Sequence, residues 1–376
     1  MLPCQGTATA SYSCFVPSPP FSPDLTLFEE QDQVLLSLQV QAQSCEAMGS
    51  HMYARLFHDL ALDYADNGRT YALLAGRSQR PIHDALPLRL AGALHRIVLQ
   101  GKDERLARHY PSVGGKPRED FTADVIAYMR DHLDEIDVAL TQQVQTNEVG
   151  RSVVHLTLLH WLTSLGIHDI DLLEVGASAG LNLNCDRYYA CSHQLRMGDT
   201  TSPIRMMGDW FTHTPTVPPT GARIRRRRGT DISPVDVSDH DDAMRLLSFV
   251  WPDQKDRFAR TKAAIEIAQQ HRPIVDRQSA DTWVRDQLER PREHATMIFH
   301  SIVWQYLGTH VQKNLTRAIS EAGQYATPST PLVWARMEPD GPHADVQVDI
   351  WNGQDEPLHF RVAEVGYHGY GLKWLL

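Results

Sequence analysis

The chain has few cysteines and no long apolar run. Its five cysteines contain no CxxC pair, so no thiolate zinc site is indicated. No apolar run reaches 18 residues, which excludes a membrane-spanning helix. The first twenty-odd residues contain no Lys or Arg and are interrupted by Ser, Thr, Gly and Pro, unlike a signal peptide. These absences predict a cytoplasmic protein with no metal and no membrane partner.

Basic residues are also fewer than acidic residues. The formal net charge is −10 over 376 residues. A protein that binds nucleic acid through its phosphates needs a basic face, so this balance argues against a nucleic-acid partner. A small-molecule partner is the better expectation, while the composition does not indicate an oligomeric state.

Three regions differ in their residue patterns. Residues 1–26 are rich in Pro, Ser and Thr and predict an irregular arm. Residues 27–165 carry apolar side chains at helical spacing, as at Leu90, Leu94, Ile97 and Val98, and predict an α-helical domain. Residues 166–376 predict a third region of short apolar strands that alternate with helices.

This last region indicates an α/β domain with a Rossmann-like, mostly parallel sheet. The tail alternates at Val346, Val348 and Ile350, which predicts antiparallel C-terminal strands. Residues 186–221 are expected to be an insertion. The predicted strands are Ile170–Val175, Ala222–Arg226, Pro273–Asp276, Thr296–Phe299 and Leu332–Met337, and the predicted helices are Asp253–Gln270 and Trp304–Ala322.

The segment DLLEVGASAGLNL, from Asp171 to Leu183, fits two different motifs. With Glu174 closing a strand and Gly176 and Gly180 in a turn before a helix, it is typical of a cofactor loop whose backbone approaches the ligand closely. As Gly-x-Ser178-x-Gly, it also fits the nucleophile elbow of an α/β-hydrolase.

Acidic residues follow the next two predicted strands. Asp231, after Gly229 and Thr230, stands where a carboxylate accepts hydrogen bonds from both ribose hydroxyls of a nucleoside. Asp281 stands where an acid could meet an adenine amino group, although an ordinary helix cap is equally expected.

The fourth strand runs into HSIVWQYL, from His300 to Leu307. Its end should open into the cleft at the carboxyl ends of the strands, so His300, Ser301, Trp304 and Tyr306 are candidate substrate-facing residues. A neutral histidine suits proton removal, and His300 and Tyr306 are the predicted catalytic pair.

Three further segments have simpler interpretations. The run Arg225–Arg228 is expected on an edge strand or insertion as solvated charge. In WPDQ, Asp253 is expected to cap the helix that follows. The polar segment Gln145–Arg151 is either a capped boundary or a polar wall of the pocket.

A serine hydrolase remains an alternative. It would use Ser178 as nucleophile, an acid among Asp231, Asp281 and Glu338, and His368 as base, in the chain order of that fold. Because the residues upstream of Ser178 are helical rather than strands, strand order favours the cofactor loop. A non-catalytic protein that binds a small ligand is a further alternative.

Taken together, the chain resembles a bacterial family of domain of unknown function 2332. The resemblance rests on QTNEVGR at Gln145–Arg151, GASAGLN at Gly176–Asn182, DRY at Asp186–Tyr188, RGTDISP at Arg228–Pro234, WPDQ at Trp251–Gln254, HSIVWQYL at His300–Leu307, Glu338, and His368-Gly369.

This resemblance implies a core similar to class I S-adenosylmethionine-dependent methyltransferases after a helical domain. Two segments differ from those enzymes: Ser178 replaces the middle glycine of the loop, and Phe299-His300-Ser301-Ile302 stands where amide and base N-methyltransferases carry Asn-Pro-Pro-Tyr. The expected cofactor is S-adenosylmethionine. The residues implied to bind it are Glu174, Gly176, Ser178, Gly180, Asn182, Asp231 and Asp281, and those implied to bind substrate are Asn147, Glu148, Arg151, Trp251 and Trp304.

Overall fold

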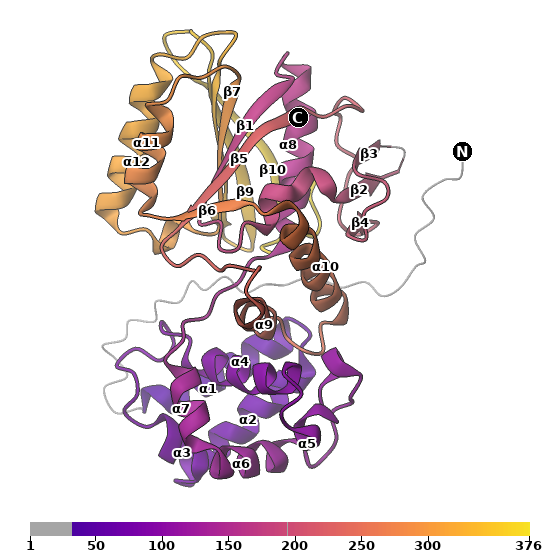
Figure 1. Ribbon diagram of the computed structural model, residues 1–376, viewed down its shortest axis with the longest axis vertical. Helices are drawn as coiled ribbons and strands as arrows, with labels where there is room; N and C mark the ends of the chain where they lie inside the picture. The colour runs from indigo at the N-terminus through magenta and orange to yellow at the C-terminus, as the bar shows by residue number, and fades with distance from the viewer. Residues whose placement is uncertain (1–31, 194) are drawn as a thin grey trace. The chain divides into compact units, whose positions relative to one another are not determined.

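The computed structural model describes residues 32–193 and 195–376 (Figure 1). The described chain divides into two compact units. One, the sheet unit, consists of Asn147–Ser238 and Ala263–Leu376; the other, the helical unit, consists of 32–146 and Asp239–Lys262. The expected N-terminal arm lies outside the described residues.

The helices of the helical unit form where apolar side chains recur about one helical turn apart. Its helices are α1 Gln33–Ala47, α2 His51–Ala65, α3 Arg69–Leu74, α4 Leu86–Leu99, α5 Glu104–Ala107, η2 Pro111–Val113, α6 Phe121–Asp131, α7 Leu133–Leu140, α9 His240–Ser248 and the first part of α10 Lys255–His271. Residues one turn apart, such as Leu56 and Leu60 or Leu90 and Leu94, are fully buried in one core. The predicted helical region is therefore confirmed. None of the described helices is both long and apolar enough to cross a membrane.

The boundary of the helical unit differs from the predicted one. Helix α8, Ser152–Ser164, belongs to the sheet unit, whereas residues Asp239–Lys262 join the helical unit. All side chains from Ser152 to Leu162 are buried, so α8 has no polar face to mark a domain edge. Asp253 also differs from expectation, since it accepts hydrogen bonds from Ser50 Oγ (2.6 Å) and Met52 N (3.1 Å) at the start of α2.

The sheet unit contains an eight-stranded sheet in the order β11-β10-β9-β8-β7-β1-β5-β6. Strands β6, β5, β1, β7 and β8 are parallel, and β9, β10 and β11 continue antiparallel. The mostly parallel sheet and its antiparallel finish are confirmed. The strands are β1 Asp169–Val175, β5 Arg223–Asp231, β6 Ile274–Arg277, β7 Ala295–Ser301, β8 Leu332–Asp340, β9 His343–Trp351, β10 Leu358–Val365 and β11 Lys373–Trp374.

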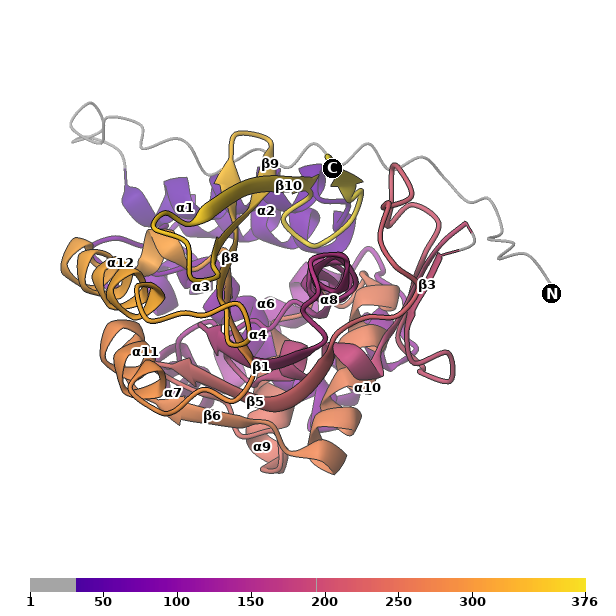
Figure 2. The ribbon, with the colours of Figure 1, turned by 90° about the horizontal axis from the view of Figure 1, so that it is seen from above.

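Helices cover both faces of this sheet. Figures 1 and 2 show α11, Ala280–Leu288, and α12, Thr309–Gly323, on one face and α8 on the other. Leu173, Ile298, Trp334 and Leu315 form the core between the sheet and the α11–α12 layer. Because β7 is covered on both faces, Ala295–His300 are all buried.

Strand β5 is internal, which corrects the expected edge position of the arginine run. It pairs with β1 on one side and β6 on the other. Its guanidinium groups are neutralised by aspartates, with Arg226–Asp171 at 3.0 Å, Arg227–Asp186 at 2.7 Å and Arg228–Asp276 at 2.7 Å. These ion pairs thus link β5 to its neighbouring strands β1 and β6 and to the segment that contains Asp186.

The insertion after the glycine loop forms a small sheet of its own. It consists of β2 Tyr189–Ser192, β3 Leu195–Gly198 and β4 Arg205–Met207, in the order β3-β2-β4. The segment before it, η4 Leu181–Arg187, is a 3-10 helix with a non-helical Asn184, where an α-helix was expected. The loop therefore does not lead into an α-helix N-terminus. The helix expected from Trp304 likewise begins at Thr309, after a 3-10 turn η5, Trp304–Tyr306.

Candidate functional site

The segments of the sheet unit that carry polar motifs meet at the carboxyl ends of the parallel strands. Helix α8 leads directly into β1, so its N-terminus and the preceding η3, Val149–Arg151, lie at that end of the sheet. Asn147 Oδ1 accepts a hydrogen bond from Leu181 N (2.9 Å), and Asn182 Nδ2 donates to Glu148 O (3.1 Å). These contacts join the Asn147–Arg151 segment to the end of the glycine loop.

Arg151 ties the same segment to the ends of other strands. Its Nε donates to Tyr367 O (3.0 Å) after β10, and its Nη1 donates to Ser301 O (3.1 Å) at the end of β7. Two of its donors are thus used on backbone carbonyls. Arg151 thus links this segment to the ends of β7 and β10, and its predicted contact with a substrate stays a prediction.

The glycine loop is closed by contacts within the protein. Gly176 N and Ala177 N both donate to Thr230 O, at 2.9 and 3.0 Å, and Gly180 N donates to Ala177 O at 2.7 Å. Gly176 has φ +70°, and a Cβ placed on it would lie 2.7 Å from a methyl of Val303. Glycine is required there because the turn after β7 packs directly against the loop.

Ser178, which replaces the middle glycine, keeps a left-handed backbone. Its φ is +52°, and its side chain is buried, with 3% exposed. Its N–H donates to Asp231 Oδ2 at 2.9 Å, while Asp231 Oδ1 accepts from Ser233 N at 2.9 Å. The carboxylate of Asp231, at the end of β5, therefore lies directly against the loop after β1.

Asp281 lies at the first turn of α11, where it joins two helices. Its Oδ1 accepts from Ser279 Oγ (2.6 Å), and its Oδ2 accepts from Asn314 Nδ2 of α12 (3.0 Å). Both carboxylate oxygens thus have protein partners. Asp281 is therefore not the N-cap of α11, which is Ser279, but an acid of its first turn that joins α11 to α12.

Glu174 is a buried acid at the end of β1. Its Oε1 lies 3.9 Å from Nε2 of His155 on α8, and both side chains are almost fully covered. Burial raises the pKa of Glu174 to about 8 and lowers the pKa of His155 to about 4. Glu174 therefore keeps its proton at neutral pH.

His300 and Glu338 form a second pair, on the sheet face that α11 and α12 cover. Nδ1 of His300 lies 2.6 Å from Glu338 Oε1, and the imidazole stacks on the ring of Trp304 with centroids 5.4 Å apart. Glu338 also accepts from the backbone N–H groups of Val303 and Trp304, both at 3.3 Å. His300 is fully buried, whereas Tyr306, its predicted partner, is 73% exposed.

The other predicted residues are less closely connected. His368 Nδ1 lies 3.2 Å from Glu148 Oε2, so the histidine proposed as a hydrolase base is paired with the acid of η3. Trp251 belongs to the helical unit, where it is 7% exposed and packs 6.4 Å from Tyr53 between ring centroids. Trp251 is therefore a core residue of that unit, contrary to its expected role.

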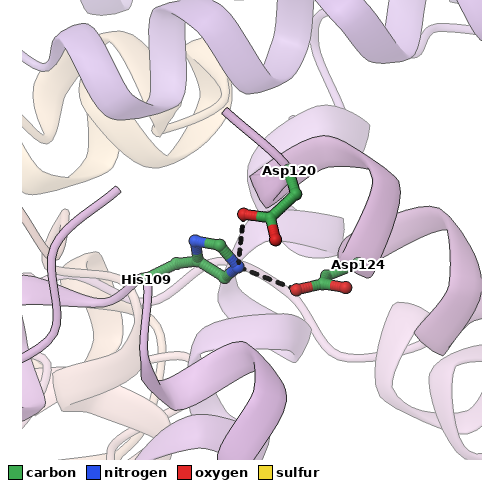
Figure 3. A group of neighbouring side chains, drawn as sticks. All are labelled: His109, Asp120 and Asp124. Carbon is green, nitrogen blue, oxygen red and sulfur yellow. Dashed lines mark hydrogen bonds and ion pairs between the residues drawn. The ribbon is translucent and has the colours of Figure 1, made fainter. Parts of the chain in front are cut away.

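Among the residues that the structure describes, two clusters have the ligand atoms to hold a metal ion, His109-Asp120-Asp124 and Asp340-His343-Asp345. In the first, His109 Nε2 lies 2.8 Å from Asp124 and 3.8 Å from Asp120 (Figure 3). The guanidinium of Arg108 also lies 2.6 Å from both carboxylates and supplies the positive charge itself. In the second, Arg361 binds both oxygens of Asp345, at 2.9 and 2.7 Å. Neither donor set favours a cation.

Sequence patterns missed several parts of this site. His155 lies in an apolar helix that contains another histidine, and Val303 is an ordinary aliphatic residue, so nothing in the sequence distinguishes either of them. Glu338 was named as one possible acid of a hydrolase and as part of the family resemblance, but its pairing with His300, 38 residues earlier, has no local pattern. Ile232, directly after Asp231, is 78% exposed, which its position after a strand-ending acid could have indicated.

A family model matches most of the chain. The family model described as "Uncharacterized protein conserved in bacteria (DUF2332)" matches residues 37–374. No curated protein and no solved structure matches the chain. The family match spans both units and every segment of the candidate site. The chain therefore belongs to this uncharacterised bacterial family, DUF2332.

Proposed function

We propose that this chain is an S-adenosylmethionine-dependent methyltransferase that acts on a small molecule. The observation that carries the proposal is the contact of Asp231, at the end of β5, with the loop after β1. This contact lies beside the point where the strand order reverses, between β1 and β7. Ligands of open α/β sheets bind at such a point, outside the carboxyl ends of the strands.

The sheet order supports the proposal. If the five parallel strands are numbered as they occur along the chain, their order across the sheet is third, second, first, fourth, fifth. Antiparallel strands follow the fifth parallel strand. We interpret this as a methyltransferase-type Rossmann arrangement in which a β8–β9 hairpin and β10 complete the sheet. The interpretation is one of fold, and the activity rests on the site.

Asp231 and Ile232 fit a nucleoside. Each oxygen of Asp231 accepts one backbone N–H and retains capacity for a second hydrogen bond, which two neighbouring ribose hydroxyls could supply. Ile232 next to it offers an exposed apolar side chain for a base. The oxygens of Asp281 likewise each accept one hydrogen bond from the protein, and its contact with an adenine amino group stays a prediction.

The loop favours a cofactor without phosphates. The N–H groups of Gly176, Ala177 and Gly180 bind carbonyl oxygens, and that of Leu181 binds Asn147. A dinucleotide requires free loop amides and a helix N-terminus for its pyrophosphate, whereas η4 is a short 3-10 helix. These contacts argue against a nicotinamide or flavin dinucleotide.

When bound, S-adenosylmethionine would supply a methyl group on a sulfonium. In this chemistry, the protein would orient the methyl acceptor and would receive the proton of the acceptor. His300, held through Nδ1 by Glu338, is the group we assign to that role.

Calorimetry tests the proposal. We expect the wild-type protein to bind S-adenosylmethionine and S-adenosylhomocysteine, and Asp231→Asn to weaken both at least tenfold, since a charge-assisted hydrogen bond contributes about 1.5–3 kcal/mol. Asp199→Asn, at an exposed turn of the small sheet, is the matched control and should bind as the wild type does. No heat at millimolar ligand would overturn the proposal.

One observation supports the alternative of a serine hydrolase. Ser178, in the turn after β1, has a left-handed backbone, as the nucleophile of such an enzyme has in its sharp turn. A fluorophosphonate probe that labels the wild type but not Ser178→Ala would establish that activity. Binding of the adenosyl ligand without any methyl transfer to a broad set of small acceptors would instead favour the ligand-binding alternative.

A further inference from the structure

Two buried nitrogen atoms near the end of β7 lack hydrogen-bond partners. They are Nε2 of His300 and Nε1 of Trp334, and neither has a partner within the described part of the chain. The two side chains are 0% and 6% exposed, respectively. Buried polar atoms are nearly always satisfied in native proteins, so each of these requires an explanation.

The two atoms belong to one aromatic cluster. His300 pairs in register with Arg336, so Trp334, two residues earlier on β8, lies on the same sheet face. The rings of His300 and Trp334 are 6.1 Å apart between centroids, and Trp304 lies 5.4 Å from the first and 6.0 Å from the second. Trp304 is partly exposed, so the cluster reaches the surface at this ring.

The hydrogen-bond characters of the two atoms are complementary. In the neutral tautomer of His300 whose Nδ1–H donates to Glu338, the imidazole presents a lone pair at Nε2. The indole N–H of Trp334 can only donate. A hydroxyl group both donates and accepts, so it matches the hydrogen-bond character of both atoms; a carboxylate has no proton for Nε2, and an ammonium cannot accept from the indole.

The turn beside the cluster is strained. Ile302 has φ +51°, an unfavourable backbone conformation for a β-branched residue, and its N–H is held by Met337 O at 2.9 Å. The same turn directs the N–H groups of Val303 and Trp304 onto Glu338. Strain of this kind concentrates at functional sites, which favours a binding role over simple core packing.

We propose that His300 Nε2 and Trp334 Nε1 form a binding site for the hydroxyl group of a neutral substrate with an apolar body, such as an aromatic or aliphatic alcohol. The inference rests on the proposed function for its place in a reaction, since it makes the methyl acceptor an oxygen. As a binding site it can be measured without any cofactor.

Phenol and toluene are suitable probes because toluene carries a methyl group of similar size where phenol carries the hydroxyl group. We expect phenol to bind the wild type at least fivefold more tightly than toluene, by calorimetry or tryptophan fluorescence, and to shift the indole ¹⁵N–H resonance of Trp334 in protein labelled at tryptophan. Trp334→Phe and His300→Phe should each reduce the preference for phenol about 3- to 10-fold, the effect of one lost hydrogen bond.

Trp351→Phe is the matched control, since Trp351 belongs to the same core but not to the three-ring cluster. Thermal unfolding of each variant shows whether it is folded. Equal affinity for phenol and toluene in the wild type would overturn the inference, as would a preference for phenol that persists in both Trp334→Phe and His300→Phe. If phenol binds as expected and S-adenosylmethionine does not bind, the hydroxyl site stands and the proposed methyltransferase fails; the reverse result rejects the hydroxyl site alone.

Discussion

The carboxyl group of Glu174 lies 3.9 Å from Nε2 of His155, and neither side chain is appreciably exposed. Burial moves the two pKa values in opposite directions, to about 8 for Glu174 and to about 4 for His155. Between these values both groups are uncharged. The pair thus places two neutral polar groups, without an ion pair, directly before the glycine loop.

The pH dependence of stability tests this state of Glu174. Its folded pKa lies above the ordinary value of 4.5, so its contribution to stability is fully present below pH 4.5 and is lost as the pH rises towards 8. Glu174→Gln removes that loss. We expect the variant to match the wild type near pH 4.5 and to exceed its free energy of unfolding at pH 8 by about 2–4 kcal/mol, as measured by urea denaturation.

Glu321→Gln, on the exposed surface of α12, is the control, and its effect should not change between the two pH values. A Glu174→Gln protein that is no more stable than the wild type at pH 8 would show that Glu174 is ionised in the folded protein.

The arginines of β5 should differ sharply in their effect on stability. Arg227 binds both oxygens of Asp186, at 2.7 and 2.9 Å, and also donates to Leu183 O at 2.9 Å, with only 20% of its side chain exposed. Arg227→Met leaves Asp186 without its partner and should cost about 2–4 kcal/mol. Arg225→Met, at a position 47% exposed, should cost less than about 1 kcal/mol.

Arg227→Lys extends this test, because a lysine cannot form the forked contact and should recover less than half of the loss. Chemical denaturation of the three variants measures the differences. Equal effects of the Arg227 and Arg225 substitutions would contradict the ion-pair roles described above.

The strain at Ile302 should be measurable as well. Glycine adopts φ +51° without penalty, so Ile302→Gly should retain or raise the melting temperature despite the loss of a partly buried side chain. Leu307→Gly, at a partly buried position with φ −77°, provides the comparison and should lose about 1 kcal/mol or more. Similar destabilisation by both would mean that Ile302 is not strained.

The histidine cluster of the helical unit gives a prediction about metal ions. Arg108 occupies the position of a cation between Asp120 and Asp124, so Zn²⁺ at equimolar concentration should not change the melting temperature of the wild type. Arg108→Met frees the two carboxylates beside His109 and should make the melting temperature rise with Zn²⁺. Stabilisation of the wild type by Zn²⁺, abolished in His109→Gln, would instead identify a native metal site.

Much of the fold could be predicted from local patterns. Helical spacing identified residues 33–140 as helical, and the short apolar runs ending at Val175 and Met337 identified strands, because burial of one face or both faces imposes a period on the sequence. Positions at the carboxyl ends of strands, such as Asp231 and His300, could also be predicted to lie at one edge of the sheet, since parallel strands end at a common edge. Helix α8 was assigned to the wrong unit because a helix that is apolar on every side does not indicate which neighbours cover it.

The sequence by itself determined the helical region and the parallel strands, and that the carboxyl ends of these strands carry polar side chains. The tertiary structure alone decided which of these side chains pair. Glu174 with His155, His300 with Glu338, and Arg227 with Asp186 are joined across 19, 38 and 41 positions of the chain. No local period encodes such contacts, because they depend on strand order and on the register between strands, and these are set by packing of the whole sheet.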